Sequence, residues 1–141
     1  MKTLYFRIQG IPYLMKPERT VVLIDDDHDD FEIFSMALSE ADPSVLCIYY
    51  DSAKEALVKL TEQNSPQPDF IFLDLNMPGM NGLQFLESLK ESTISNLPVV
   101  VYSTSLLPTH KEKIKNLGVF SSFIKPFSHR ELIKILKSIL D

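Results

Sequence analysis

The sequence lacks several features that would place it in a specialised class of protein. It has a single cysteine, Cys47, which lies in an apolar run and is predicted to be a buried core thiol. One cysteine cannot form an internal disulfide or a zinc cluster, and this fits a reducing cytoplasm. No apolar stretch approaches the roughly 18 residues that a membrane span needs. The sequence therefore predicts a cytoplasmic protein without a membrane segment.

An excess of positive charge is also missing. The formal net charge is -5 and the pI is about 5.2, which argues against a nucleic-acid-binding surface. There is no internal repeat and no low-complexity linker. The 141 residues, 45% of them hydrophobic and 23% charged, are enough for one domain with a real core.

The N-terminal residues do not resemble a signal peptide. The apolar residues Leu4, Tyr5 and Phe6 are soon followed by Arg7 and Pro12, and no small-residue cleavage site follows. We therefore expect an N-terminal extension over residues 1–19 and a folded domain over residues 20–141. Residues 1–15 are expected to be flexible or peripheral and to take no part in the chemistry.

The folded domain alternates predicted strands and helices five times. Apolar runs predict strands at Thr20–Asp25, Val45–Tyr49, Asp69–Asp74, Leu97–Ser103 and Phe120–Lys125. Helical spacing predicts helices around residues 31–41, 53–60, 83–89, 109–117 and 132–139, the fourth being the weakest. Ser128 is a candidate N-cap, and Gly118 is a candidate C-terminal stop. Alternation of this kind predicts an α/β fold with a parallel, doubly wound sheet and helices on both faces.

Charged residues follow three of the predicted strands directly. Asp25 and Asp26 end the first strand, Asp74 ends the third, and Lys125 ends the fifth. Ligands of open α/β sheets bind outside the carboxyl ends of the strands, so these side chains are expected to meet. Carboxylates at about 4 Å repel by roughly 4 kcal/mol per pair at an effective dielectric constant near 20. They need a cation, and an oxygen-only cluster suits Mg²⁺. The product predicted for such a site is a phosphorylated aspartate.

Four blocks of the sequence resemble one known family. VVLIDDD, FIFLDLNMPGMNG, LPVVVYSTS and FIKPF are similar to the signature blocks of the receiver domain of bacterial two-component response regulators. The resemblance covers about residues 20–141. It implies a flavodoxin-like (CheY-like) fold whose five parallel strands are ordered 2-1-3-4-5, which would bring the three acidic residues together.

The resemblance implies a role for each acidic residue. Asp74 matches the phosphoacceptor, Asp26 the direct Mg²⁺ ligand, and Asp25 the companion acid. The ion would also bind Asp74 and the backbone carbonyl of Asn76. The neighbouring residue Asp27 is either a helix cap or part of the outer coordination shell of the metal ion.

Three more residues among 25–30 have structural interpretations. Asp29 and Asp30 are expected to favour the dipole of the first helix, and His28 is expected to be a surface residue. Gly82 is expected to allow the backbone turn into the third helix.

The resemblance extends to the last two strands. Lys125 matches the lysine that pairs with the acids and then with the phosphoryl oxygens, and Ser103 matches the hydroxyl that bonds the phosphoryl group. The family also has a cis peptide at the position of Lys125–Pro126. One departure concerns Ser122, which stands where receivers usually carry an aromatic residue three positions before the lysine. Either a neighbouring phenylalanine replaces it, or the output couples differently.

These interpretations together predict a stand-alone response regulator. It would accept a phosphoryl group from a sensor histidine kinase or a histidine phosphotransfer protein, with Mg²⁺ as cofactor. An unknown downstream protein would bind the face made by the fourth helix, the fifth strand and the fifth helix. Apolar residues on the last helix would support a homodimer, with core packing as the alternative. Such a domain is a phosphoacceptor and not an enzyme in the ordinary sense.

Two other functions remain open. The chain could be a receiver-like scaffold that acts without phosphorylation. This alternative is supported by Ser122, which replaces the usual aromatic residue. It could also be an aspartyl-nucleophile phosphatase, but such enzymes resemble a motif with a second acid two residues after the nucleophile, where this chain has Asn76.

Overall fold

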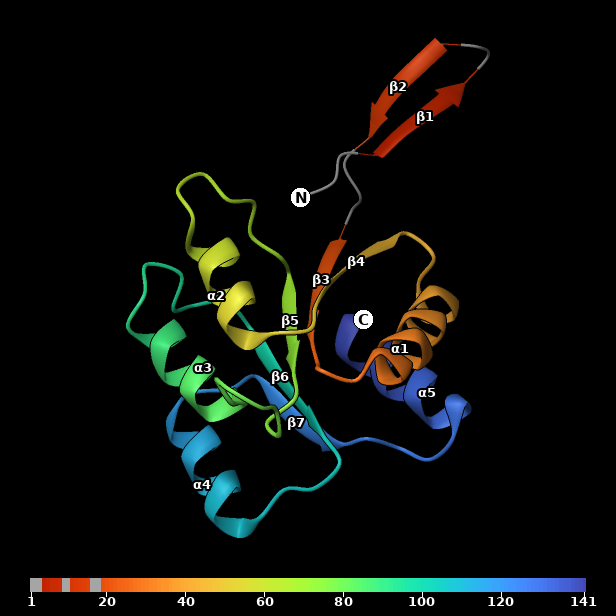
Figure 1. The fold of residues 1–141 in the computed structure, drawn as a ribbon. Helices are drawn as coiled ribbons and strands as arrows, with labels where there is room; N and C mark the ends of the chain where they lie inside the picture. Colours follow the sequence, from red (N-terminus) through yellow and green to blue (C-terminus); the bar gives the residue numbers. More distant parts are fainter. Residues whose placement is uncertain (1–3, 9–10, 16–18) are drawn as a thin grey trace.

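The computed structural model describes residues 4–8, 11–15 and 19–141 of the chain (Figure 1). Within these ranges there are two sheets, one with two strands near the N-terminus and one with five strands. Five helices accompany the larger sheet. Across these described ranges, no helix has both the length and the apolar character needed to cross a membrane.

The larger sheet is parallel and has the strand order β4-β3-β5-β6-β7. The strands are β3 (Arg19–Ile24), β4 (Val45–Tyr50), β5 (Phe70–Leu73), β6 (Val99–Ser103) and β7 (Ser121–Ile124). Counted from β3, this is the order 2-1-3-4-5, and the predicted doubly wound fold is confirmed. Because the chain leaves β3 toward β4 and then returns to β5 on the other side of β3, a crevice opens at the carboxyl ends of β3 and β5.

Helices cover both faces of this sheet (Figure 1). The helices are α1 (His28–Ala41), α2 (Ala53–Thr61), α3 (Gly82–Lys90), α4 (Pro108–Asn116) and α5 (His129–Leu140). The pair α1 and α5 packs on one face, with a core that includes Phe34 and Phe72. The other three helices pack on the opposite face, with a core that includes Phe85. The central strands β3, β5 and β6 are covered on both faces and are accordingly almost entirely apolar, whereas the edge strand β7 begins with two serines.

Four of the five helices in the described ranges begin at a side chain that accepts hydrogen bonds from backbone amides of the first turn. These caps are Asp27, Ser52, Asn81 and Ser128. A cap of this kind contributes about 1 kcal/mol. The predicted Ser128 cap is therefore confirmed, and the open assignment of Asp27 is decided in favour of a cap.

The helix α4 has the weakest attachment, as its sequence predicted. It begins after Leu107 without a side-chain cap, and Ile114 is its buried residue. It ends before Gly118, whose φ of 72° lies in the left-handed region that glycine adopts without strain. Ile114 anchors the helix in the core, and Leu106 and Leu117 at its two ends are partly buried against the same core.

The backbone contains one hairpin that was not predicted, and one expectation about a peptide bond was wrong. No strand was predicted in residues 1–15, but β1 (Leu4–Ile8) and β2 (Ile11–Met15) pair antiparallel as a hairpin. The cis peptide suggested for Lys125–Pro126 is absent, since this bond is trans, as is every other peptide bond among the described residues. The family resemblance was its only support, and trans is the ordinary state of a bond before proline.

Candidate functional site

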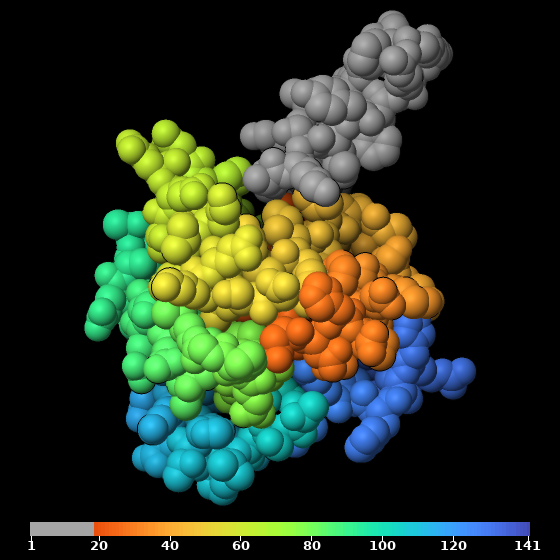
Figure 2. All heavy atoms as spheres, viewed as in Figure 1, coloured from red at the N-terminus to blue at the C-terminus, as the bar shows by residue number. Residues whose placement is uncertain are grey.

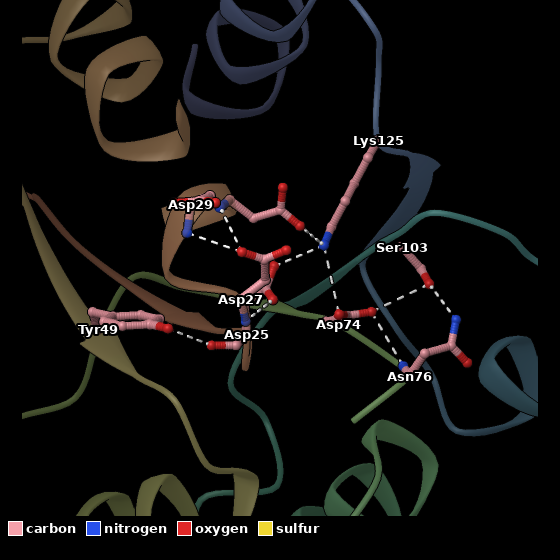
Figure 3. Close-up of polar contacts among 9 residues, drawn as sticks. Asp25, Asp27, Asp29, Tyr49, Asp74, Asn76, Ser103 and Lys125 are labelled. Atoms are coloured by element: carbon pink, nitrogen blue, oxygen red, sulfur yellow. Dashed lines mark hydrogen bonds and ion pairs between the residues drawn. The ribbon is translucent and has the colours of Figure 1, made fainter. Parts of the chain in front are cut away.

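The candidate site lies at the carboxyl ends of four neighbouring strands (Figure 3). Asp25 follows β3, Asp74 follows β5, Ser103 is the last residue of β6, and Lys125 follows β7. The sheet ladder continues into these positions, because the Asp74 amide donates to Ile24 and the Lys125 amide donates to Ser103. The side chains therefore start from a rigid backbone, and the structure brings all four together as predicted.

Three carboxylates form the acidic part of the site. Oxygen atoms of Asp25, Asp26 and Asp74 lie within 4.8 Å of one another. Asp25 and Asp74 are buried, while Asp26 is exposed. In the space-filling view, the orange surface around the start of α1 lies beside the green surface of the segment that follows β5 (Figure 2). One exposed and two buried carboxylates give an oxygen-only donor set that suits a hard cation such as Mg²⁺.

Asp25 is fixed by three hydrogen bonds. Its Oδ1 accepts from the Asp27 amide at 2.9 Å, its Oδ2 accepts from Lys125 Nζ at 2.7 Å, and its backbone carbonyl accepts from the Tyr49 hydroxyl at 2.7 Å. Burial nevertheless raises the pKa of the Asp25 carboxyl, although the bonds from Lys125 and Asp27 favour the charged form. A cation bound beside this carboxyl would favour its charged form and oppose the effect of burial.

Lys125 is the central cation of the site. Its Nζ lies 2.7 Å from Asp25, 2.7 Å from Asp30 and 3.5 Å from Asp74, and 5.0 Å from the centre of the Tyr102 ring. Burial alone would lower the pKa of Lys125, but the hydrogen bonds to Asp25 and Asp30 outweigh it and raise that pKa above its usual value. The ammonium group therefore stays charged across the physiological range.

The two carboxylate oxygens of Asp74 have different partners. Its Oδ1 accepts from the Asn76 amide at 3.1 Å and from the Ser103 hydroxyl at 3.3 Å. The Asn76 side-chain amide in turn donates to Ser103 Oγ at 3.2 Å. The other oxygen, Oδ2, faces Lys125. Ser103 is thus directed at the predicted phosphoacceptor, while the role of the Asn76 backbone carbonyl as a metal ligand stays a prediction.

One member of the site, Asp30, was not predicted from the sequence. Asp30 was expected to serve only the dipole of α1, but its Oδ2 binds Lys125 as closely as Asp25 does. Because α1 begins after the cap Asp27, residue 30 falls in the first turn beside the sheet edge. The run of acidic residues at the start of a helix could have pointed to a further acidic residue in the site. Which of them faces the site depends on the residue at which the helix begins, and this could not be predicted from the sequence.

Other assignments concern residues around the site. His28 is a surface residue as expected, with a side chain 70% exposed and its Nε2 atom 3.5 Å from Asp51 Oδ2. Gly82 is the first residue of α3, at the turn into this helix, and its φ is not positive, so glycine is not needed there for backbone conformation. A Cβ atom there would lie 2.6 Å from the Asp74 carbonyl oxygen, so glycine is needed for close packing.

A parallel sheet in the order 2-1-3-4-5, with five helices, is the CheY-like architecture. The chain also matches the family model of the response regulator receiver domain over residues 21–137. It therefore belongs to the response regulator receiver domains.

Individual relatives agree with this family. The nitrate/nitrite response regulator protein NarL of Escherichia coli K12 is 34% identical over 122 residues, which are 84% of this chain and 54% of NarL. The chain thus spans about half the length of this curated relative. Among solved structures, the phosphorylated cyanobacterial phytochrome response regulator RcpA is 28% identical with a TM-score of 0.78, covering 86% of this chain and 90% of RcpA. The Mn²⁺-bound response regulator Rcp1 is 26% identical with a TM-score of 0.75, covering 86% and 91%.

Proposed function

We propose that Asp74 accepts a phosphoryl group from a phosphohistidine of a sensor histidine kinase or a histidine phosphotransfer protein. The observation that carries this proposal is the convergence on Asp74 of a hydroxyl from β6, an ammonium group from β7 and two further carboxylates from the end of β3. A carboxylate with only a structural role would not need two further carboxylates beside it, because like charges repel. The family to which the chain belongs supports the same conclusion.

The proposed reaction is an in-line displacement at phosphorus. A carboxylate oxygen of Asp74 forms the new P–O bond while the P–N bond of the phosphohistidine breaks, and the imidazole leaves with the bonding electrons. The protein contributes position and charge to this step. Lys125 would offset the charge of the transferred group, and Ser103 would donate a hydrogen bond to one of its oxygens.

The acidic cluster fits a divalent cation in this role. Asp25, Asp26 and Asp74 would hold Mg²⁺ together with the Asn76 carbonyl, and the relative Rcp1 has been solved with Mn²⁺ bound. Such an ion supplies positive charge to the phosphoryl oxygens. The chain's own contribution is to present the carboxylates on fixed backbone, with Asp26 exposed to solvent.

The proposed output surface is the face formed by α4, β7 and α5. On this face Ser122 leaves a hollow of about 300 Å³, lined by Lys111, Ile114, Lys115, Val119, Ser121 and Ser122. Neither nearby phenylalanine fills this hollow. Phe123 packs against Tyr102 in the core of the opposite face, and Phe120 is 58% exposed. Phosphorylation would therefore be transmitted to the partner protein through α4, and not through the rotation of an aromatic side chain at position 122.

A stand-alone role is part of the proposal. The solved chains of RcpA and Rcp1 are covered to 90% and 91%, so related proteins have been solved as chains of about this size. Output would then run through another protein, a phosphorelay or a second copy of the chain.

The proposal is tested with purified protein, Mg²⁺ and acetyl phosphate, read by intact mass. We expect one added phosphoryl group in the wild type, and none in Asp74→Asn or without Mg²⁺. A stable beryllofluoride adduct in the wild type would separate fast hydrolysis from a lack of acceptance. Failure of both reactions would contradict the proposal and favour the scaffold, and partner binding unchanged in Asp74→Asn would do the same. Turnover of exogenous phosphate esters would instead favour a phosphatase, although the Asn76 amide has no acidic proton for a leaving group.

A further inference from the structure

The ammonium group of Lys125 is shared unequally among three carboxylates. It has three N–H donors. Two short contacts of 2.7 Å go to Asp25 and Asp30, whereas the contact to Asp74 is 3.5 Å. Figure 3 shows the Lys125 side chain reaching across the site between Asp74 and the residues at the start of α1. In the unphosphorylated protein, therefore, the Lys125 ammonium is bound mainly by Asp25 and Asp30 and only weakly by Asp74.

The contacts of Lys125 with Asp25 and with Asp30 differ in how much free energy is needed to break them. The Asp25 side chain is fully buried, so without Lys125 its charge would lose its nearest cation inside the protein. The Asp30 side chain is 27% exposed and can be hydrated if Lys125 leaves it. Removing the partner of a buried charge is far more unfavourable than removing that of a partly exposed one. A new anion that recruits Lys125 will thus displace Asp30 first.

We propose that Asp30 is a positioning residue that holds Lys125 toward α1 in the unphosphorylated protein and is exchanged for the phosphoryl group on Asp74. This inference rests on the proposed function of Asp74. Asp30 acts through Lys125 and does not touch the transferred group. The exchange lowers the affinity for the phosphoryl group, because the new contact replaces an existing one. It also leaves an unpaired carboxylate on the first turn of α1 once the protein is phosphorylated.

The chain offers a matched control in Asp29. Both aspartates lie in the first turn of α1, and the backbone amides of both donate to the Asp27 cap, at 2.9 Å for Asp29 and 3.4 Å for Asp30. Asp29→Asn therefore removes the same charge from the same helix end without touching Lys125. Any effect of helix dipole or general electrostatics will appear in both variants, and an effect of the Lys125 contact will appear in Asp30→Asn alone.

The experiment measures the dissociation constant of beryllofluoride by ¹⁹F NMR at saturating Mg²⁺. We expect Asp30→Asn to bind about fivefold more tightly than Asp29→Asn, the upper end of the range for partly exposed ion pairs. Asp30→Glu should return toward the wild-type value, because it restores the carboxylate. Equal affinities in the two asparagine variants would overturn the inference, while the proposed function would still stand on wild-type binding. No binding in the wild type would instead remove the proposed function.

A second measurement uses the wild type alone. The ¹³Cγ resonance of Asp30 should shift when beryllofluoride binds, because its ammonium partner leaves, and that of Asp29 should move much less. An Asp30 resonance that moves no more than that of Asp29 would contradict the exchange, whatever the variants show.

Discussion

Replacing Lys125 with methionine tests how the buried acid Asp25 is kept charged. Asp25 has no exposed surface, and its closest cation is the Lys125 ammonium at 2.7 Å. Methionine keeps an apolar stem of similar length but removes the charge. Removing one partner of a buried ion pair lowers the free energy of unfolding by about 3–5 kcal/mol, because the other charge stays uncompensated. We expect a loss of this size for Lys125→Met at about pH 8 without divalent cations.

The loss should depend on pH in a defined direction. Burial already raises the pKa of Asp25, and Lys125 opposes that rise, so the pKa will rise further in the variant. A carboxyl whose pKa is higher in the folded state binds more protons there, and stability then falls as the pH rises from the unfolded pKa through the folded one. The difference in unfolding free energy between the wild type and Lys125→Met should therefore become smaller as the pH is lowered, by up to about 1.4 kcal/mol per pH unit.

The measurement is urea denaturation in EDTA at several pH values between about 5 and 8. Lys111→Met, on the exposed surface of α4, is the control for loss of a lysine. The double variant Lys125→Met with Asp25→Asn should recover much of the stability, because it removes the stranded charge. A loss under about 1 kcal/mol at the upper pH, with no dependence on pH, would mean that Asp25 is not left uncompensated and that the pair behaves like a weak surface ion pair.

Three further predictions follow from the packing and the charge of the site. Gly82→Ala would place a Cβ 2.6 Å from the Asp74 carbonyl oxygen, and should lower the free energy of urea unfolding by about 1–3 kcal/mol and slow phosphorylation by acetyl phosphate. Ser122→Tyr should fill the hollow between α4 and β7 and raise the unfolding free energy by about 1 kcal/mol with unchanged phosphorylation; an unchanged or lower stability would contradict a free hollow. Mg²⁺ at ten times its dissociation constant should add about 1.4 kcal/mol to the unfolding free energy, and this gain should vanish when Asp25 and Asp26 are both replaced by asparagine.

The fold could be predicted because its signals are local. Runs of β-branched and aromatic residues such as Val21–Ile24 and Phe70–Leu73 form strands, and an acidic residue follows each of them. Once the strands are parallel and ordered 2-1-3-4-5, the ends of β3 and β5 must be neighbours. The meeting of Asp25 with Asp74 therefore follows from topology. The predicted strand ends differ from the observed ones by at most two residues, which is the usual uncertainty of an element's end.

The features that could not be predicted depend on side-chain direction or on contacts between distant segments. The bond of Asp30 to Lys125 joins residues 95 positions apart in the chain. The need for glycine at position 82 comes from the carbonyl of Asp74 on the preceding strand end, which no local pattern reveals. The hairpin β1–β2 was missed because Arg7 and Pro12 interrupt the apolar pattern that usually marks a strand.

The two oxygens of Asp74 connect the candidate phosphoacceptor with two different parts of the molecule. Oδ1 accepts from Ser103, which precedes the loop to the weakly held helix α4. Oδ2 faces Lys125, whose other short bonds reach the start of α1. A phosphoryl group on Asp74 would compete for both donors at once, because each is already hydrogen-bonded within the site. Phosphorylation would then be felt on α1 through Asp30 as well as on α4 through Ser103. Chemical-shift changes confined to the α4 side on beryllofluoride binding would argue against this two-sided coupling.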